Sequence, residues 1–148
     1  MKRIIGCGNL LFRDEGIGVH LIRYLQDKKL PADVELVDGA TGGFDLLSFI
    51  EGSNKVIIVD AVQGNGSPGD IYKFGADDFE VESSPKTSLH DICLKDIFNI
   101  VKLTGTMPPV TIFGVEPKTV DWGMELTEEV KAVLPRLGQL VLEEVSHA

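Results

Sequence analysis

Lys55-Val56-Ile57-Ile58-Val59-Asp60 is the stretch that decides the fold of this 148-residue chain. Its four consecutive apolar, β-branched residues suit a central strand that is buried on both faces of a sheet. An aspartate follows directly, and a carboxylate at the end of a buried strand must find a hydrogen-bond or cation partner. The stretch therefore predicts the middle of a sheet and a residue of special role at its edge.

Apolar runs and segments of helical period alternate on both sides of this strand. Strands are predicted at 3–7, 34–37, 55–59 and 110–115, with an added antiparallel edge strand at 71–74; helices are predicted at 15–28, 44–51, 90–103 and 127–144, the last interrupted near Pro135. Asp14 and Thr127 are expected to cap the first and last of these helices. We expect 63–69 and 75–86 to be loops. Such alternation indicates β-α-β units and a largely parallel sheet, an α/β fold.

Composition favours one soluble domain over residues 1–148, with 43% hydrophobic and 25% charged residues. The net charge of −9 repels phosphate backbones, and the basic residues form no cluster, so nucleic-acid binding is not expected. No apolar run approaches the ~18 residues of a membrane span. The opening MKRIIGCGN is too short for a signal-peptide core, so a cytoplasmic location is the expectation.

The two cysteines, Cys7 and Cys93, belong to no CxxC pair, which removes support for zinc-finger and thioredoxin-like sites. We interpret both as small buried apolar side chains.

Three residues remote from one another in sequence, Glu15, Asp60 and His90, each lie at a predicted strand end or helix start. In a parallel sheet such positions converge at the carboxyl edge. A helix N-terminus also lowers the pKa of a histidine, which keeps the ring neutral and able to bind a cation. Two carboxylates and one imidazole suit zinc, nickel, manganese or iron equally well. Acids at a helix start also stabilise the helix dipole, which is the ordinary explanation for Asp14 and Glu15.

Other motifs are weaker. Gly6 and Gly8 follow the first strand, but a dinucleotide-binding fingerprint would have a glycine where Leu11 stands. The chain has no GxSxG elbow, which argues against a serine hydrolase. His20 and His147 are interpreted as structural or surface residues.

Four segments together resemble the maturation endopeptidases of [NiFe] hydrogenases. Residues 6–18, GCGNLLFRDEGIG, resemble that family's opening signature G-x-G-N-x-L-x-x-D-E-x-x-G, and residues 38–43, DGATGG, resemble its D-G-G-T-x-G segment with Ala40 in place of a glycine. Val59-Asp60-Ala61 fits its strand-ending aspartate, and residues 87–90, TSLH, fit its S-x-H segment. Their order and spacing make the combination specific.

The resemblance implies a three-layer α/β sandwich around a twisted, mostly parallel five-stranded sheet with helices on both faces. It implies an endopeptidase, related to the aspartic type, that removes a C-terminal extension from the hydrogenase large-subunit precursor after nickel insertion. Glu15, Asp60 and His90 would recognise the nickel, and Asp38 would lie beside them among the catalytic residues. The precursor would supply the nickel, so no permanent cofactor is expected, although an adventitious divalent metal could occupy the site.

Two other functions remain open from the residues alone. A small-molecule metallohydrolase carrying its own divalent metal would use the same three donors. A non-enzymatic module that binds a nucleotide or a partner would use the acids only as helix caps. No heptad run is visible, so a monomer is expected.

Overall fold

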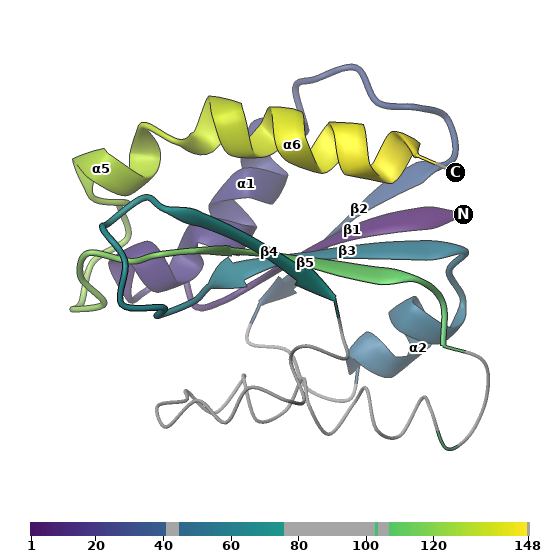
Figure 1. Cartoon of the computed structure of the whole chain (residues 1–148), viewed down its shortest axis with the longest axis horizontal. Helices are drawn as coiled ribbons and strands as arrows, with labels where there is room; N and C mark the ends of the chain where they lie inside the picture. Colours follow the sequence, from purple (N-terminus) through teal and green to yellow (C-terminus); the bar gives the residue numbers. More distant parts are fainter. Residues whose placement is uncertain (41–44, 76–102, 104–106, 148) are drawn as a thin grey trace.

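A five-stranded sheet forms the centre of the protein in our computed structural model, which describes residues 1–40, 45–75, 103 and 107–147 (Figure 1). The strand order is β2-β1-β3-β5-β4, and the apolar run of β3 lies in the middle. Four strands are parallel, and β4 runs antiparallel at one edge. The strands are β1 (Lys2–Cys7), β2 (Val34–Ala40), β3 (Lys55–Ala61), β4 (Ile71–Gly75) and β5 (Val110–Val115). The mostly parallel sheet and its antiparallel edge strand are thus confirmed.

Helices cover both faces of the sheet. Helices α1 and α6 lie on one face and α2 lies on the other, which makes the three layers visible in Figure 1. The helical segments are η1 (Arg13–Gly16, a 3-10 turn), α1 (Ile17–Leu25), α2 (Asp45–Glu51), α5 (Glu128–Lys131) and α6 (Leu134–Ser146). The three-layer α/β class is confirmed.

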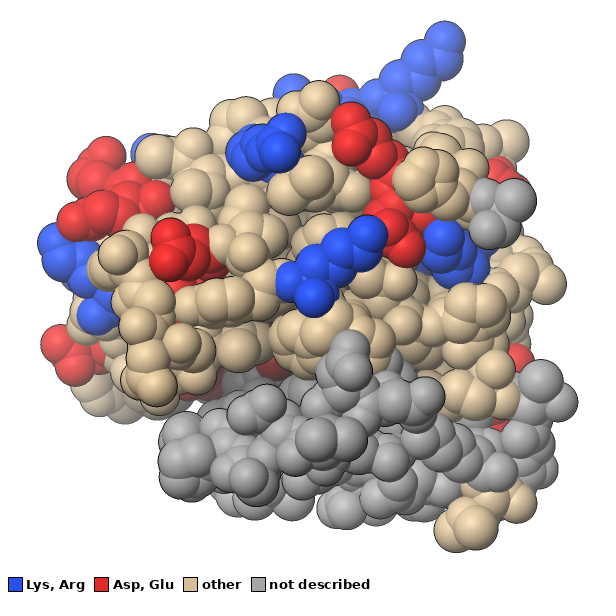
Figure 2. Space-filling model, in the orientation of Figure 1, with Lys and Arg blue, Asp and Glu red and all other residues tan. Residues whose placement is uncertain are grey.

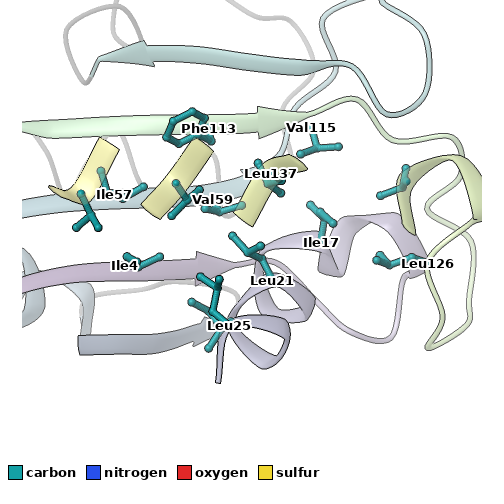
Figure 3. Packing of buried hydrophobic residues seen from close by; sticks show 14 residues of the cluster. Ile4, Ile17, Leu21, Leu25, Ile57, Val59, Phe113, Val115, Leu126 and Leu137 are labelled. Carbon is teal, nitrogen blue, oxygen red and sulfur yellow. The ribbon is translucent and has the colours of Figure 1, made fainter. Parts of the chain in front are cut away.

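Strand β3 alternates its side chains between two apolar clusters. Ile57 and Val59 point toward α1 and α6, where Figure 3 shows them packed with Leu21 and Leu137. Val56 and Ile58 belong to the cluster on the α2 face, together with Ile5, Val37, Ile50 and Ile112. Each fully buried side chain of this size stabilises the fold by about 1.5–3 kcal/mol. Burial on both faces is the physical reason why the strand reads as one continuous apolar run.

The first helix begins later than the sequence predicts. Residues Arg13–Gly16 form a 3-10 turn, and the α-helix starts at Ile17 with Gly16 at the N-cap position and no side-chain cap. Asp14 lies inside the 3-10 turn, so the prediction that it caps the helix was wrong. Its carboxylate binds elsewhere, as the site geometry below explains.

The last helical segment is divided in two. Helix α5 ends at Lys131, and Pro135 lies in the first turn of α6. Proline is accepted there because the amide that it lacks would have had no partner within the helix. The predicted interruption near Pro135 is therefore confirmed. Thr127 occupies the N-cap position of α5, but its side chain does not cap that helix.

Residues 90–102 of the predicted helix and residues 76–86 of the predicted loop lie outside the described residues. Within the described ranges, no helix has the length and apolar character needed to cross a membrane. Basic and acidic side chains are interspersed on the face drawn in Figure 2.

Candidate functional site

Asp60 lies near the carboxyl end of the central strand, where four parallel strands end at one edge of the sheet. It pairs with Gly114 of β5, and only 2% of its surface is exposed. Ala61 packs with the cluster on the α1 face, so strand alternation directs Asp60 to the opposite face, that of Ile58 and α2. The Ala61 amide donates a 2.8 Å hydrogen bond to Asp60 Oδ1. A nearly buried carboxylate is thus positioned at the edge where the sequence predicts a ligand.

The segment that contains Glu15 is held at the same edge because its backbone, and that of α1, pack closely against the backbone of neighbouring segments. A Cβ added at Gly18 would lie 2.3 Å from the carbonyl oxygen of Val59, so the first turn of α1 rests on β3 one residue before Asp60. A Cβ added at Gly8, whose φ is +121°, would lie 1.9 Å from the carbonyl oxygen of Glu15. Segment η1, which contains Glu15, also contacts β3. Two glycines without side chains therefore bring the segments of Glu15 and Asp60 together.

Asp38 occupies a different position from Asp60. It lies within β2 and pairs with Gly6 of β1, so it is separated from β3 by one strand. Alternation from Leu36 places its side chain on the α1 face, opposite to that of Asp60. Asp38 is exposed. The structure thus places it at the same edge but on the other side of the sheet.

His90 and the segment 41–43 lie outside the described residues, so the third predicted ligand has no position here. Within the described ranges, no group of three His, Cys, Asp or Glu side chains could hold a metal ion. Of the predicted ligand set, Glu15 and Asp60 are the two members that the structure places.

A carboxylate that the sequence did not single out as a long-range anchor, Asp14, joins the segment before α1 to the segment after β5. Its side chain is fully buried and accepts hydrogen bonds from the amides of Lys118 (2.8 Å) and Thr119 (3.1 Å). It also accepts bonds from the Thr127 amide (2.8 Å) and hydroxyl (2.7 Å). These donors lie 104 to 113 residues further along the chain, so no local pattern could have revealed them. Asp14 thereby fixes the backbone next to Glu15.

Asp14→Asn is expected to destabilise the protein by about 2–4 kcal/mol, because one acceptor oxygen becomes an NH₂ group that faces buried donors. Urea denaturation would measure this loss. Asp121→Asn, at an exposed position in the segment that Asp14 holds, is the matched control and should change the free energy of unfolding by less than about 0.5 kcal/mol. Equal stability of the two variants would show that the four bonds contribute little.

His20 also faces the segment after β5. Burial and the nearby Arg23 charge lower its pKa, while a hydrogen bond with the Met124 backbone acts in the opposite direction. The histidine therefore supports this segment from α1, which agrees with a structural role.

Glu116 organises the loop that follows Asp60. Its carboxylate accepts hydrogen bonds from the amides of Gly64 (2.8 Å) and Gly66 (3.1 Å) and from the Tyr72 hydroxyl. Burial, with this bond to Glu116, raises the pKa of Tyr72 to about 12. The shift favours the protonated phenol, which is the form that donates the hydrogen bond to Glu116.

Comparison with known proteins identifies the family. The family model described as hydrogenase maturation protease matches residues 19–144. The chain belongs to the hydrogenase maturation protease family. The family expected from the sequence is thereby confirmed, and as a member of this family the protein is a peptidase.

Individual relatives and a solved structure support the assignment. The hydrogenase 2 maturation protease of Escherichia coli is 32% identical over 142 residues, which cover 93% of this chain and 87% of that protein. The coenzyme F420 hydrogenase subunit delta of Methanothermobacter thermautotrophicus is 31% identical and covers 96% of this chain, with 92% of its own length matched. A solved hydrogenase maturating endopeptidase of E. coli superposes with a TM-score of 0.90 at 30% identity, covering 97% of this chain and 90% of that one. Sequence and fold therefore agree on a maturation protease.

Proposed function

We propose that this protease removes the C-terminal extension of a [NiFe]-hydrogenase large-subunit precursor after nickel insertion, and that Glu15, Asp60 and His90 recognise the inserted nickel. The observation that carries the proposal is the approach of η1 and α1 to the end of β3, where Asp60 is only 2% exposed. A carboxylate so far removed from water interacts strongly with a cation. The family relationship supports the peptidase activity.

The nickel is part of the substrate in this proposal. Bound to cysteines of the precursor, it would receive oxygen ligands from Glu15 and Asp60 and a nitrogen ligand from His90. These contacts would hold the scissile peptide in a fixed place, where its carbonyl is polarised or a water is activated. Asp38, at the same edge but on the α1 face of the sheet, would shape the path of the extension there. The protease itself needs no resident cofactor.

Specificity would follow from a difference in binding free energy. A precursor without nickel offers the buried Asp60 carboxylate no cation, and therefore docks more weakly than the loaded form. The extension would therefore be removed only from precursor into which nickel has already been inserted.

The direct test is to incubate the purified protein with nickel-loaded and with nickel-free large-subunit precursor and to weigh the products by mass spectrometry. We expect loss of a C-terminal peptide from the loaded precursor alone. Equal processing of both forms would contradict nickel recognition while leaving the peptidase activity. Metal analysis of the freshly purified protease is the control, because one tightly bound zinc per chain would instead indicate a metallohydrolase with its own metal.

A further inference from the structure

An apolar patch lies exposed next to the candidate site. It consists of Leu11, Phe12, Val120, Trp122 and Met124, from the segments before η1 and after β5. Trp122 is 74% exposed, Met124 59% and Leu11 45%, and four of the six exposed large hydrophobic residues in the described part of the chain belong to this patch. Single exposed apolar residues are ordinary, but a cluster of them marks an interaction surface.

The backbone holds the two segments of the patch together. Phe12 and Gly123 form a parallel bridge, in which the Arg13 amide donates to the Gly123 carbonyl (2.8 Å) and the Gly123 amide donates to the Leu11 carbonyl (2.9 Å). Gly123 has a φ of +151°, and a Cβ there would lie 2.9 Å from Cγ of Arg13. The rings of Phe12 and Trp122 lie 4.8 Å apart between centroids. The apolar side chains are thus arranged before any partner arrives, which lowers the entropic cost of binding.

The patch is joined through the backbone to the segment that contains Glu15. Leu11 and Phe12 precede Glu15 in one short segment, and the bonds of Asp14 tie that segment to the chain at Lys118 and Thr119. A protein that presents a metal ion to Glu15 would therefore also come within reach of the patch.

We propose that the apolar patch docks the body of the large-subunit precursor, through an apolar surface of the precursor adjacent to its nickel. This inference rests on the proposed function, and it assigns the binding contact to residues outside the metal-recognising set. Exposed acids at Asp121 and Glu125 flank the patch, so it fits a partner surface with basic residues at its rim. A second copy of this chain fits poorly, because a symmetric contact would bring these acids against their own copies.

The single tryptophan of the chain provides a direct probe of binding. Protease labelled with 5-fluorotryptophan gives one ¹⁹F resonance, from Trp122, which is followed while unlabelled nickel-loaded precursor is added. We expect this resonance to shift or broaden with precursor and to be independent of protease concentration without it. A concentration-dependent shift in the absence of precursor would show that the patch binds a second copy, and would overturn the proposal.

Processing kinetics provide the second measurement. Trp122→Ala should raise KM for the nickel-loaded precursor roughly tenfold with kcat nearly unchanged, whereas Trp122→Phe should recover most of the affinity. Leu103→Ala, at an 85% exposed position before β5 rather than after it, is the matched control and should leave KM unchanged. Melting curves would verify that each variant is folded.

The outcomes separate this proposal from the proposed function. One outcome is that the wild type cleaves the precursor, that Trp122→Ala has an unchanged KM, and that the ¹⁹F resonance does not change when precursor is added. This outcome would overturn docking at the patch and leave the proposed function intact. A resonance that responds to precursor without any cleavage would overturn the function and leave the docking surface. If the precursor is not cleaved and the ¹⁹F resonance does not respond to it, both the proposed function and the docking surface are overturned.

Discussion

Asp60→Asn is expected to lower processing of nickel-loaded precursor at least about a hundredfold without unfolding the protein. The asparagine keeps the shape of the side chain, and its amide oxygen can still accept the 2.8 Å hydrogen bond from the Ala61 amide. It loses the negative charge, which is the property that a nickel ion bound to the precursor would recognise. Single-turnover processing followed by mass spectrometry would measure the loss. Glu15→Gln and His90→Ala should have effects in the same direction.

The matched control is Asp33→Asn, the same chemical change at the opposite edge of the sheet. Asp33 directly precedes β2, and its side chain is 61% exposed with only a 4.0 Å ion pair to Lys2. Processing by this variant should equal that of the wild type. His20 is less suitable as a control, because it bonds the Met124 backbone and supports the segment that carries the patch. Normal processing by Asp60→Asn would remove Asp60 from the proposed mechanism.

Gly18→Ala is expected to destabilise the protein by at least about 3 kcal/mol. The new methyl group would lie 2.3 Å from the Val59 oxygen, 2.4 Å from the Cys7 oxygen and 2.5 Å from the Cys7 nitrogen. All three are backbone atoms of central strands, so no side-chain movement can relieve the overlap. Helix α1 would have to move away from β1 and β3, which would also displace Glu15 from Asp60. Urea denaturation and processing should therefore both report a loss.

Gly138→Ala in α6 is the control for the helical position itself. A Cβ at Gly138 would lie 3.0 Å from the ring of Tyr24, a side chain that can shift, and alanine favours a helix over glycine by about 1 kcal/mol. We expect little change in stability there. If Gly18→Ala were as stable as Gly138→Ala, the close approach of α1 to the sheet would not be essential.

The strands could be predicted because their signal is local. The β-branched run of β3, the apolar run of β1 that ends at turn residues, and the short apolar run at 71–74 each carry their own pattern. The structure places all three apolar runs as strands. The end of β2 was less clear, because it continues through Asp38 to Ala40, with an irregular register beside Cys7. Alternation of side chains cannot reveal such an irregularity from sequence.

The start of α1 could not be predicted, for a related reason. An aspartate before a helical stripe normally caps the helix, but Asp14 instead satisfies four donors contributed by Lys118, Thr119 and Thr127. Tertiary hydrogen bonds override the local preference, and their partners have no fixed spacing along the chain. The same holds for Glu116, whose bonds to Gly64 and Gly66 close a loop that the sequence identifies only by composition.

Part of the candidate site followed from topology. Placing Glu15 and Asp60 at one edge required only a parallel sheet and the known position of strand ends. The opposite directions of Asp38 and Asp60 required the register of β1 with both neighbours, which sequence alone does not provide. His90 lies outside the described residues, and its place in the ligand set stays a prediction.

The bridge between Phe12 and Gly123 is made of main-chain groups, with bonds from the Arg13 amide and to the Leu11 carbonyl. This junction requires glycine at position 123, but its hydrogen bonds join main-chain groups and so do not depend on the side chains of most residues around it. The outward-facing side chains can therefore diversify during evolution while Glu15 stays in place. In this way, proteases of this architecture could adapt to different hydrogenases by changing the exposed side chains of the patch while the backbone that holds Glu15 stays the same.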